Sequence, residues 1–176
     1  MQNMTQRRTQ TRVQWFGKRF SPFFALLTFL ACQYDPHAHL YTTQEPQPAD
    51  LPGHYALVTQ TLTRAGLAAL HGKPCDIELR ADGTFTARNI PPWQSGPPGE
   101  NFFSTLVSGS GRWRVDSVGA IDDGSRQLKT HWGIYLDSPA GKMEPVGLTG
   151  QKPPYGLIFT LGDPDSGDAL IFEKTK

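Results

Sequence analysis

Apolar and charged residues alternate without a break from position 75 to position 80, in the stretch Cys-Asp-Ile-Glu-Leu-Arg. Successive side chains of a β-strand point to opposite faces of its sheet, so this alternation predicts a strand with one face against a core. Asp82-Gly83 follows, and glycine accepts the positive φ that a tight turn requires. Because alternation resumes from Thr84 to Ile90, the two runs predict a β-hairpin.

The same period recurs along the chain, and its longest run extends from Gln127 to Asp137. In that run one predicted face carries Leu128, Thr130, Trp132, Ile134 and Leu136. About eight strands are expected, at 54–60, 75–80, 84–90, 111–116, 127–137, 146–150, 155–161 and 169–174. Eight antiparallel strands in a meander can close on themselves and so remove exposed edges. We therefore predict an all-β fold, a closed or nearly closed barrel, with a two-sheet sandwich as the alternative.

One short helix is expected between the first two strands, over residues 63–71. Gly72 and Pro74 follow it, and glycine just past the last turn with proline soon after is the usual helix stop. A helix of this length is not stable alone, so we expect it to pack across one end of the sheet.

The first 31 residues have the features of an export signal. The apolar run from Phe20 to Ala31 has twelve residues, whereas a membrane-spanning helix needs about 20. Five basic residues precede or begin this run, and no acidic residue occurs before Asp35. A positive leader followed by a short apolar segment is typical of a signal peptide.

The end of this segment, Leu30-Ala31-Cys32-Gln33, resembles the lipobox of bacterial lipoproteins. The resemblance implies cleavage after residue 31 and a lipid anchor on Cys32, which then binds the chain to the membrane. With Gln33 after the cysteine, it also implies sorting to the outer membrane, facing the periplasm of the cell envelope. An ordinary cleaved signal, which gives a secreted or periplasmic protein, and a short uncleaved anchor are the alternatives.

The exported part is acidic and has two regions. Removing the five basic residues of the signal leaves 12 basic against 16 acidic residues, a net charge of −4. No basic patch remains, so nucleic-acid binding is not expected. Residues 32–52 are rich in proline and polar residues, which predicts a lipid anchor followed by a flexible tether. Residues 53–176 form the predicted barrel domain.

The start of that domain, Gly53-His54-Tyr55, resembles the Gly-x-Trp start of lipocalins and related calycin barrels. The chain as a whole is similar to small bacterial lipoproteins built on lipocalin-like barrels. This resemblance implies that the protein binds a ligand or a partner in the cell envelope, and it implies no specific chemistry.

Aromatic residues are the candidate binding residues. Trp93, Phe102 and Phe103 lie in a long connection that either guards the open end of the barrel or plugs it as core. Three further aromatic residues are expected to point inward, where they either line a ligand cavity or simply form core: Trp113, Trp132 and Tyr155. The leading hypothesis is a binding module for a small apolar ligand, and a module with a solid core that binds or inhibits an envelope protein is the alternative.

Metal, cofactor and catalytic sites are not expected. Asp163, Asp165 and Asp168 are better explained by a turn than by a calcium loop, since glycine occupies the third acidic position. His37 and His39 have no fixed carboxylate nearby in sequence. No serine-hydrolase elbow, His-Glu-x-x-His motif or phosphate loop occurs, so an enzyme that uses scattered His and Asp residues ranks last. Cys75 is expected to be a buried, unreactive thiol.

Overall fold

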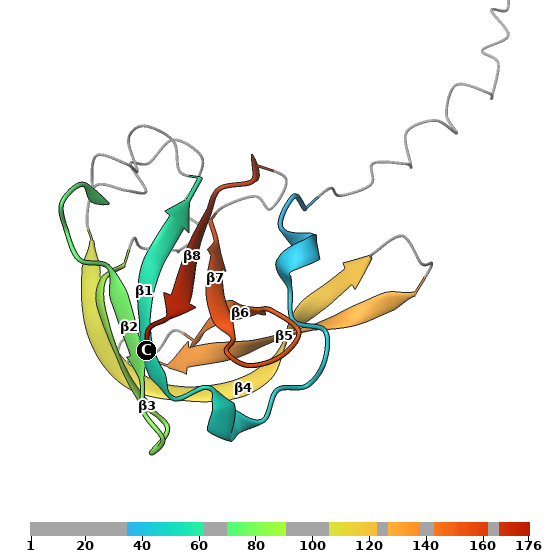
Figure 1. The fold of residues 1–176 in the computed structure, drawn as a ribbon, viewed down its shortest axis with the longest axis horizontal. Coiled ribbons are helices and arrows are strands. Elements are labelled where there is room, and N and C mark those ends of the chain that lie inside the picture. Colours follow the sequence, from blue (N-terminus) through green and yellow to red (C-terminus); the bar gives the residue numbers. More distant parts are fainter. Residues whose placement is uncertain (1–34, 62–69, 91–105, 123–126, 138–142, 162–165) are drawn as a thin grey trace, which may run out of the picture. The chain divides into compact units, whose positions relative to one another are not determined.

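Eight antiparallel strands pair in chain order into one ring-like sheet, which closes into a barrel where β1 pairs with β8 (Figure 1). The computed structural model describes residues 35–61, 70–90, 106–122, 127–137, 143–161 and 166–176. The strands are β1 (Gly53–Gln60), β2 (Asp76–Leu79), β3 (Thr84–Ile90), β4 (Val107–Asp122), β5 (Leu128–Asp137), β6 (Met143–Thr149), β7 (Gly156–Thr160) and β8 (Ala169–Lys174). The all-β prediction is therefore confirmed, and the barrel replaces the sandwich alternative.

The expected hairpin after β2 forms as the sequence predicts. Leu79 pairs with Phe85 across the turn, and Gly83 has a φ of +79°, a conformation that glycine adopts without a Cβ clash. The expected helix over 63–71 falls mainly on residues 62–69, which lie outside the described part of the chain. At its expected end, Leu70 is buried and Gly72 has a φ of +69°.

Inward-facing side chains of all eight strands occupy the barrel interior as one contiguous apolar cluster. Tyr55 from β1 and Phe172 from β8 are fully buried in it, and Leu51 and Leu161 extend it beyond the strands. Gly111 also borders the interior, because a Cβ there would collide with the Phe85 ring and the backbone of Asp137. The core is thus built from the apolar half of each alternating strand.

Leu128 is an exception to the predicted face of β5. It was expected to point inward with Ile134 and Leu136, but its side chain is 73% exposed, whereas those two residues are buried. The cause lies in the pairing: β6 pairs with β5 only from Gly133 to Asp137, so residues 128–132 extend past the end of that pairing while still paired with β4. A register shift between Ser117 and Gly119 separates this two-stranded extension from the rest of β4.

Residues 35–52, which we call the docked segment, differ from the flexible tether that their composition predicts. Thr42 lies between β5 and β6: its N–H donates to the Leu148 carbonyl at 2.9 Å, and its carbonyl accepts from Trp132 N–H at 2.9 Å. Tyr41 forms an isolated antiparallel bridge with Thr149. The segment therefore continues the hydrogen bonding of the sheet at the point where β5 and β6 stop pairing with each other.

The docked segment also buries apolar surface on the outside of the barrel. Tyr41 packs in a second cluster with Ile121 of β4, Ile158 of β7 and Ala169 of β8. Ile158 lies between Leu157 and Phe159, which belong to the interior cluster, so its side chain points outward. Ala38 and Leu40, in the 3-10 helix η2 (Ala38–Leu40), pack against the same cluster.

The second 3-10 helix, η3 (Pro48–Asp50), lies beside the start of β1 and the end of β8. Leu51 follows it and is fully buried in the core, and its carbonyl accepts the Tyr55 hydroxyl proton at 2.6 Å. Lys174 Nζ donates to the Asp50 carbonyl at 2.7 Å. Gly53 lies directly against the end of the Lys174 side chain. No helix within the described residues is long and apolar enough to span a bilayer.

Candidate functional site on the outer face of β1, β2 and β3

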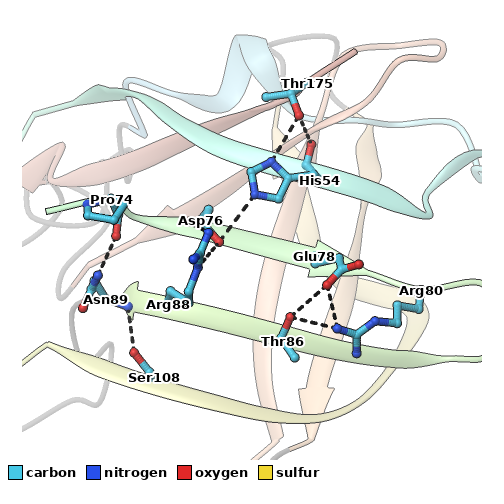
Figure 2. Close-up of polar contacts among 10 residues, drawn as sticks. All are labelled: His54, Pro74, Asp76, Glu78, Arg80, Thr86, Arg88, Asn89, Ser108 and Thr175. Carbon is cyan, nitrogen blue, oxygen red and sulfur yellow. Dashed lines mark hydrogen bonds and ion pairs between the residues drawn. The ribbon is translucent and has the colours of Figure 1, made fainter.

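A network of polar side chains covers the outer face of β1, β2 and β3 (Figure 2). Its centre is Asp76, whose side chain is only 9% exposed, paired with Arg88, whose side chain is 61% exposed. Arg88 Nε donates to Asp76 Oδ1 at 2.9 Å, and Nη2 lies 2.8 Å from Oδ2. Such a two-pronged pair fixes the plane of the guanidinium as well as its position.

The register of the hairpin explains why these two residues meet. Asp76 and Arg88 are direct cross-strand partners, as are Ile77 and Ala87 on the opposite, inward face. Oppositely charged partners on one face of an antiparallel pair stabilise the pairing. The Asp76 carboxylate raises the pKa of Arg88, first through the hydrogen bond and then through its charge.

His54 joins this pair to the end of the chain. Its Nε2 lies 3.5 Å from Asp76 Oδ1, and its Nδ1 lies 3.1 Å from Thr175 Oγ1 (Figure 2). The Thr175 hydroxyl donates to the His54 carbonyl at 3.1 Å, and Thr175 N–H donates to the same carbonyl at 2.8 Å. His54 therefore contacts Asp76 through one ring nitrogen and Thr175 through the other.

A second set of hydrogen-bonded side chains lies beside the Asp76–Arg88 pair. Arg80 Nη2 donates to Glu78 Oε2 at 2.6 Å, and Thr86 Oγ1 donates to the same oxygen at 3.2 Å. Glu78 and Thr86 are cross-strand partners of β2 and β3. The carboxylate therefore holds both neighbours on a surface that water reaches, since the Arg80 and Glu78 side chains are both more than one third exposed.

Asn89 closes the network at the end of β3. It is the one non-glycine residue of the described part of the chain with a positive φ, +55°, and it lies in the register shift between Ala87 and Ile90. Its N–H donates to Ser108 Oγ at 3.1 Å, and its Nδ2 donates to the Pro74 carbonyl at 2.6 Å. Asparagine tolerates this left-handed conformation better than most residues, and here its backbone N–H and its side-chain amide nitrogen each donate one hydrogen bond.

The aromatic residues predicted to bind a ligand do not belong to this outer network. Tyr155 is buried in the interior cluster, and Trp113 is half-buried against the same cluster, with its indole N–H donating to the Arg80 carbonyl at 2.9 Å. Trp132 is also half-buried, but it does not belong to that cluster. Trp93, Phe102 and Phe103 lie outside the described residues, as does Cys32.

The histidine and cysteine candidates have separate surroundings. His37 Nε2 donates to the Gly167 carbonyl and His39 Nδ1 donates to the Pro36 carbonyl, each at 3.0 Å, so the two imidazoles do not converge. Within the described residues no group of three or more possible metal-ligating side chains occurs. Cys75 is buried, and burial raises the pKa of its thiol to about 12.

Sequence reasoning did not identify the outer network, although a signal for it was present. Counting outward from the Asp82-Gly83 turn places Asp76 opposite Arg88 and Glu78 opposite Thr86. The participation of Thr175 had no local signal, because it depends on the closure of the ring between β1 and β8.

No protein-family model, no curated protein and no solved structure matches this chain. Its class therefore follows from its own structure, as a closed antiparallel barrel with an apolar interior and a hydrogen-bonded polar network on one outer face.

Proposed function

We propose that this protein is an exported, lipid-anchored module that binds another protein of the cell envelope through the outer surface of its barrel. The observation that carries the proposal is the interior cluster, which extends without interruption from Leu51 at one end to Leu70 and Leu161 at the other. Side chains that fill a small eight-stranded barrel leave its outer surface and loops for recognition. The alternative of the sequence analysis, a solid-core binding module, is therefore favoured over a small apolar ligand.

The network of β1–β3 is the surface that we propose for recognition. Arg88 is exposed, yet Asp76 fixes its guanidinium, so little side-chain freedom is lost when a partner binds it. Arginine is also enriched among the residues that contribute most to protein interfaces. A carboxylate or backbone carbonyl of the partner is the group that suits the exposed edge of this guanidinium.

The anchor and the compartment rest on the sequence. The positive leader, the twelve-residue apolar run and the Ala31-Cys32 junction support export with lipidation of Cys32. Catalysis is not part of the proposal, because the sequence contains none of the catalytic motifs considered above and Arg88 binds both oxygens of Asp76.

Site-specific photocrosslinking in intact cells tests this function. A photoreactive residue at Ser110, the exposed cross-strand neighbour of Thr86, should give one discrete protein adduct, whereas the same residue at exposed Lys152 should not. Arg88→Lys keeps the positive charge but loses the planar guanidinium that binds both Asp76 oxygens, so it should weaken the Ser110 adduct several-fold. The control variant Lys152→Arg should leave the Ser110 adduct unchanged. Equal adducts at both positions, or an Arg88→Lys variant that crosslinks normally, would contradict the proposal.

The small-ligand alternative has its own test. An organic extract of the folded protein should contain no stoichiometric apolar compound if side chains fill the interior. Recovery of such a compound, one per chain, would favour the small-ligand function over the one proposed.

A further inference from the structure

The first residues of the docked segment are fixed at the end of the barrel where β7 connects to β8. His37 donates to the Gly167 carbonyl at 3.0 Å, and Pro36 packs against Gly167. Asp35 accepts the His37 N–H at 2.8 Å and also accepts the Tyr41 hydroxyl proton. Position 35 is therefore held against the barrel by several contacts.

Only two residues separate Cys32 from Asp35. An extended chain advances at most about 3.6 Å per residue, so Asp35 lies within about 11 Å of Cys32. A free tether over residues 33–52 would instead reach about 60 Å at 3.1 Å per residue. The docking of residues 35–52 thus removes most of the reach that the composition alone predicts.

We propose that the docked segment holds the barrel against the membrane surface, with the end that carries the β7–β8 connection facing the lipid headgroups. This inference rests on the lipid anchor at Cys32 proposed above. The partner at this end is a lipid surface, because acyl chains on Cys32 enter the bilayer and the connecting chain is too short to let the barrel turn over.

The opposite end of the barrel is then the one that faces away from the membrane. Successive connections of a closed antiparallel sheet alternate between its two ends, so the β2–β3 turn, with Ala81, lies at the end opposite the β7–β8 connection, with Ser166. The eight residues of β1 run between these ends, a length of about 26 Å along the strand. Labels at the two positions should therefore report different distances from the bilayer.

Quenching of a fluorophore by lipid measures that difference. The acylated full-length protein is placed in vesicles of phosphatidylethanolamine and phosphatidylglycerol that contain a lipid with a nitroxide on its headgroup. One variant carries the fluorophore at Ser166→Cys and the matched control carries it at Ala81→Cys, both in exposed turns or connections. Cys75 does not compete for the label, since it is buried and its thiol pKa is raised to about 12.

The expected result is quenching at position 166 that exceeds quenching at position 81 several-fold. Insertion of twelve Gly and Ser residues between Gln33 and Tyr34 should abolish the difference while leaving the protein on the vesicles. Equal quenching at the two positions, or a difference that survives the insertion, would overturn the inference while the lipid anchor still stands. Protein that stays off the vesicles, with the mass of unmodified Cys32, would contradict the anchor itself and this inference with it.

Discussion

The phenol ring of Tyr41 stacks on the imidazole of His131, with ring centroids 3.8 Å apart and planes inclined by 11°. Tyr41 belongs to the docked segment and His131 to β5, so the stack joins the segment to the barrel. His131 Nε2 is buried without a hydrogen-bond partner among the described residues. A Cβ on Gly147 would lie 2.7 Å from that nitrogen, so the ring lies directly over the β6 backbone.

The first prediction concerns pH. Burial lowers the pKa of His131 from 6.5 to about 4, a shift opposed by a Leu148 backbone hydrogen bond and the charge of Asp35. Because the folded pKa lies below the unfolded one, this stability is present above about pH 6.5 and is lost as pH falls toward 4. The expected loss is on the order of 1–2 kcal/mol after solvent screening. The protection factor of the Thr42 amide, which is its exchange rate corrected for the intrinsic effect of pH, should therefore fall over that range.

His131→Phe should remove this part of the pH dependence, because phenylalanine keeps the stack and carries no titrating nitrogen. The matched control is His39→Phe, at an exposed position of the same docked segment. A His131→Phe variant whose Thr42 protection factor still falls between pH 6.5 and 4 would show that another group titrates.

The second prediction concerns Thr42, which is fully buried where the docked segment meets β5 and β6. Thr42→Val removes the hydroxyl that donates to the Gly150 carbonyl at 2.6 Å, and we expect it to lower the free energy of unfolding by about 1–2 kcal/mol. Thr43→Val is the control, since that hydroxyl bonds to Gln151 at an exposed site. Urea denaturation compares the two, and equal losses of unfolding free energy would contradict the larger contribution predicted for the buried Thr42 hydroxyl.

The third prediction concerns Tyr55. Burial raises the pKa of its hydroxyl, which donates to the Leu51 carbonyl and so connects η3 to the core. Tyr55→Phe leaves that carbonyl without this donor and should cost about 1–2 kcal/mol. Tyr135→Phe, on the outer face of β5 beside Arg114, should cost less than about 0.5 kcal/mol. Thermal denaturation of both variants supplies the test, and indistinguishable midpoints would contradict it.

The fourth prediction compares the two carboxylates of the outer network. Asp76→Asn removes a buried charge that binds Arg88 through both oxygens, and should destabilise the fold by about 1–3 kcal/mol. Glu78→Gln breaks an exposed pair with Arg80 and should cost less than about 1 kcal/mol. Chemical denaturation at pH 7 measures both losses. Should Glu78→Gln prove the more damaging, the central place of Asp76 in the network would be wrong.

The alternation of polar and apolar residues is the feature of the sequence from which the strands could be predicted. Polar and apolar residues alternate at every position from Asp76 to Leu79 and again from Thr84 to Arg88, so these strands, their turn and their inward faces follow from the local pattern. The burial of Phe172 in β8 is consistent with the same alternation.

The docked segment could not be foreseen in this way. Its proline-rich composition carries no period, and Thr42 is fixed by bonds to Leu148 and Trp132, roughly one hundred residues away along the chain. The burial of His131 likewise depends on Tyr41 of the docked segment covering it. The extension that exposes Leu128 likewise depends on where β6 ceases to pair, which no local pattern records.

Native mass spectrometry of the purified protein tests the central claim, that side chains rather than a ligand fill the barrel and that recognition lies outside it. We predict that the folded protein has the mass of its processed chain plus any lipid on Cys32, and that denaturation leaves this mass unchanged. An additional stoichiometric mass that is present in the folded protein and lost on denaturation would contradict the claim.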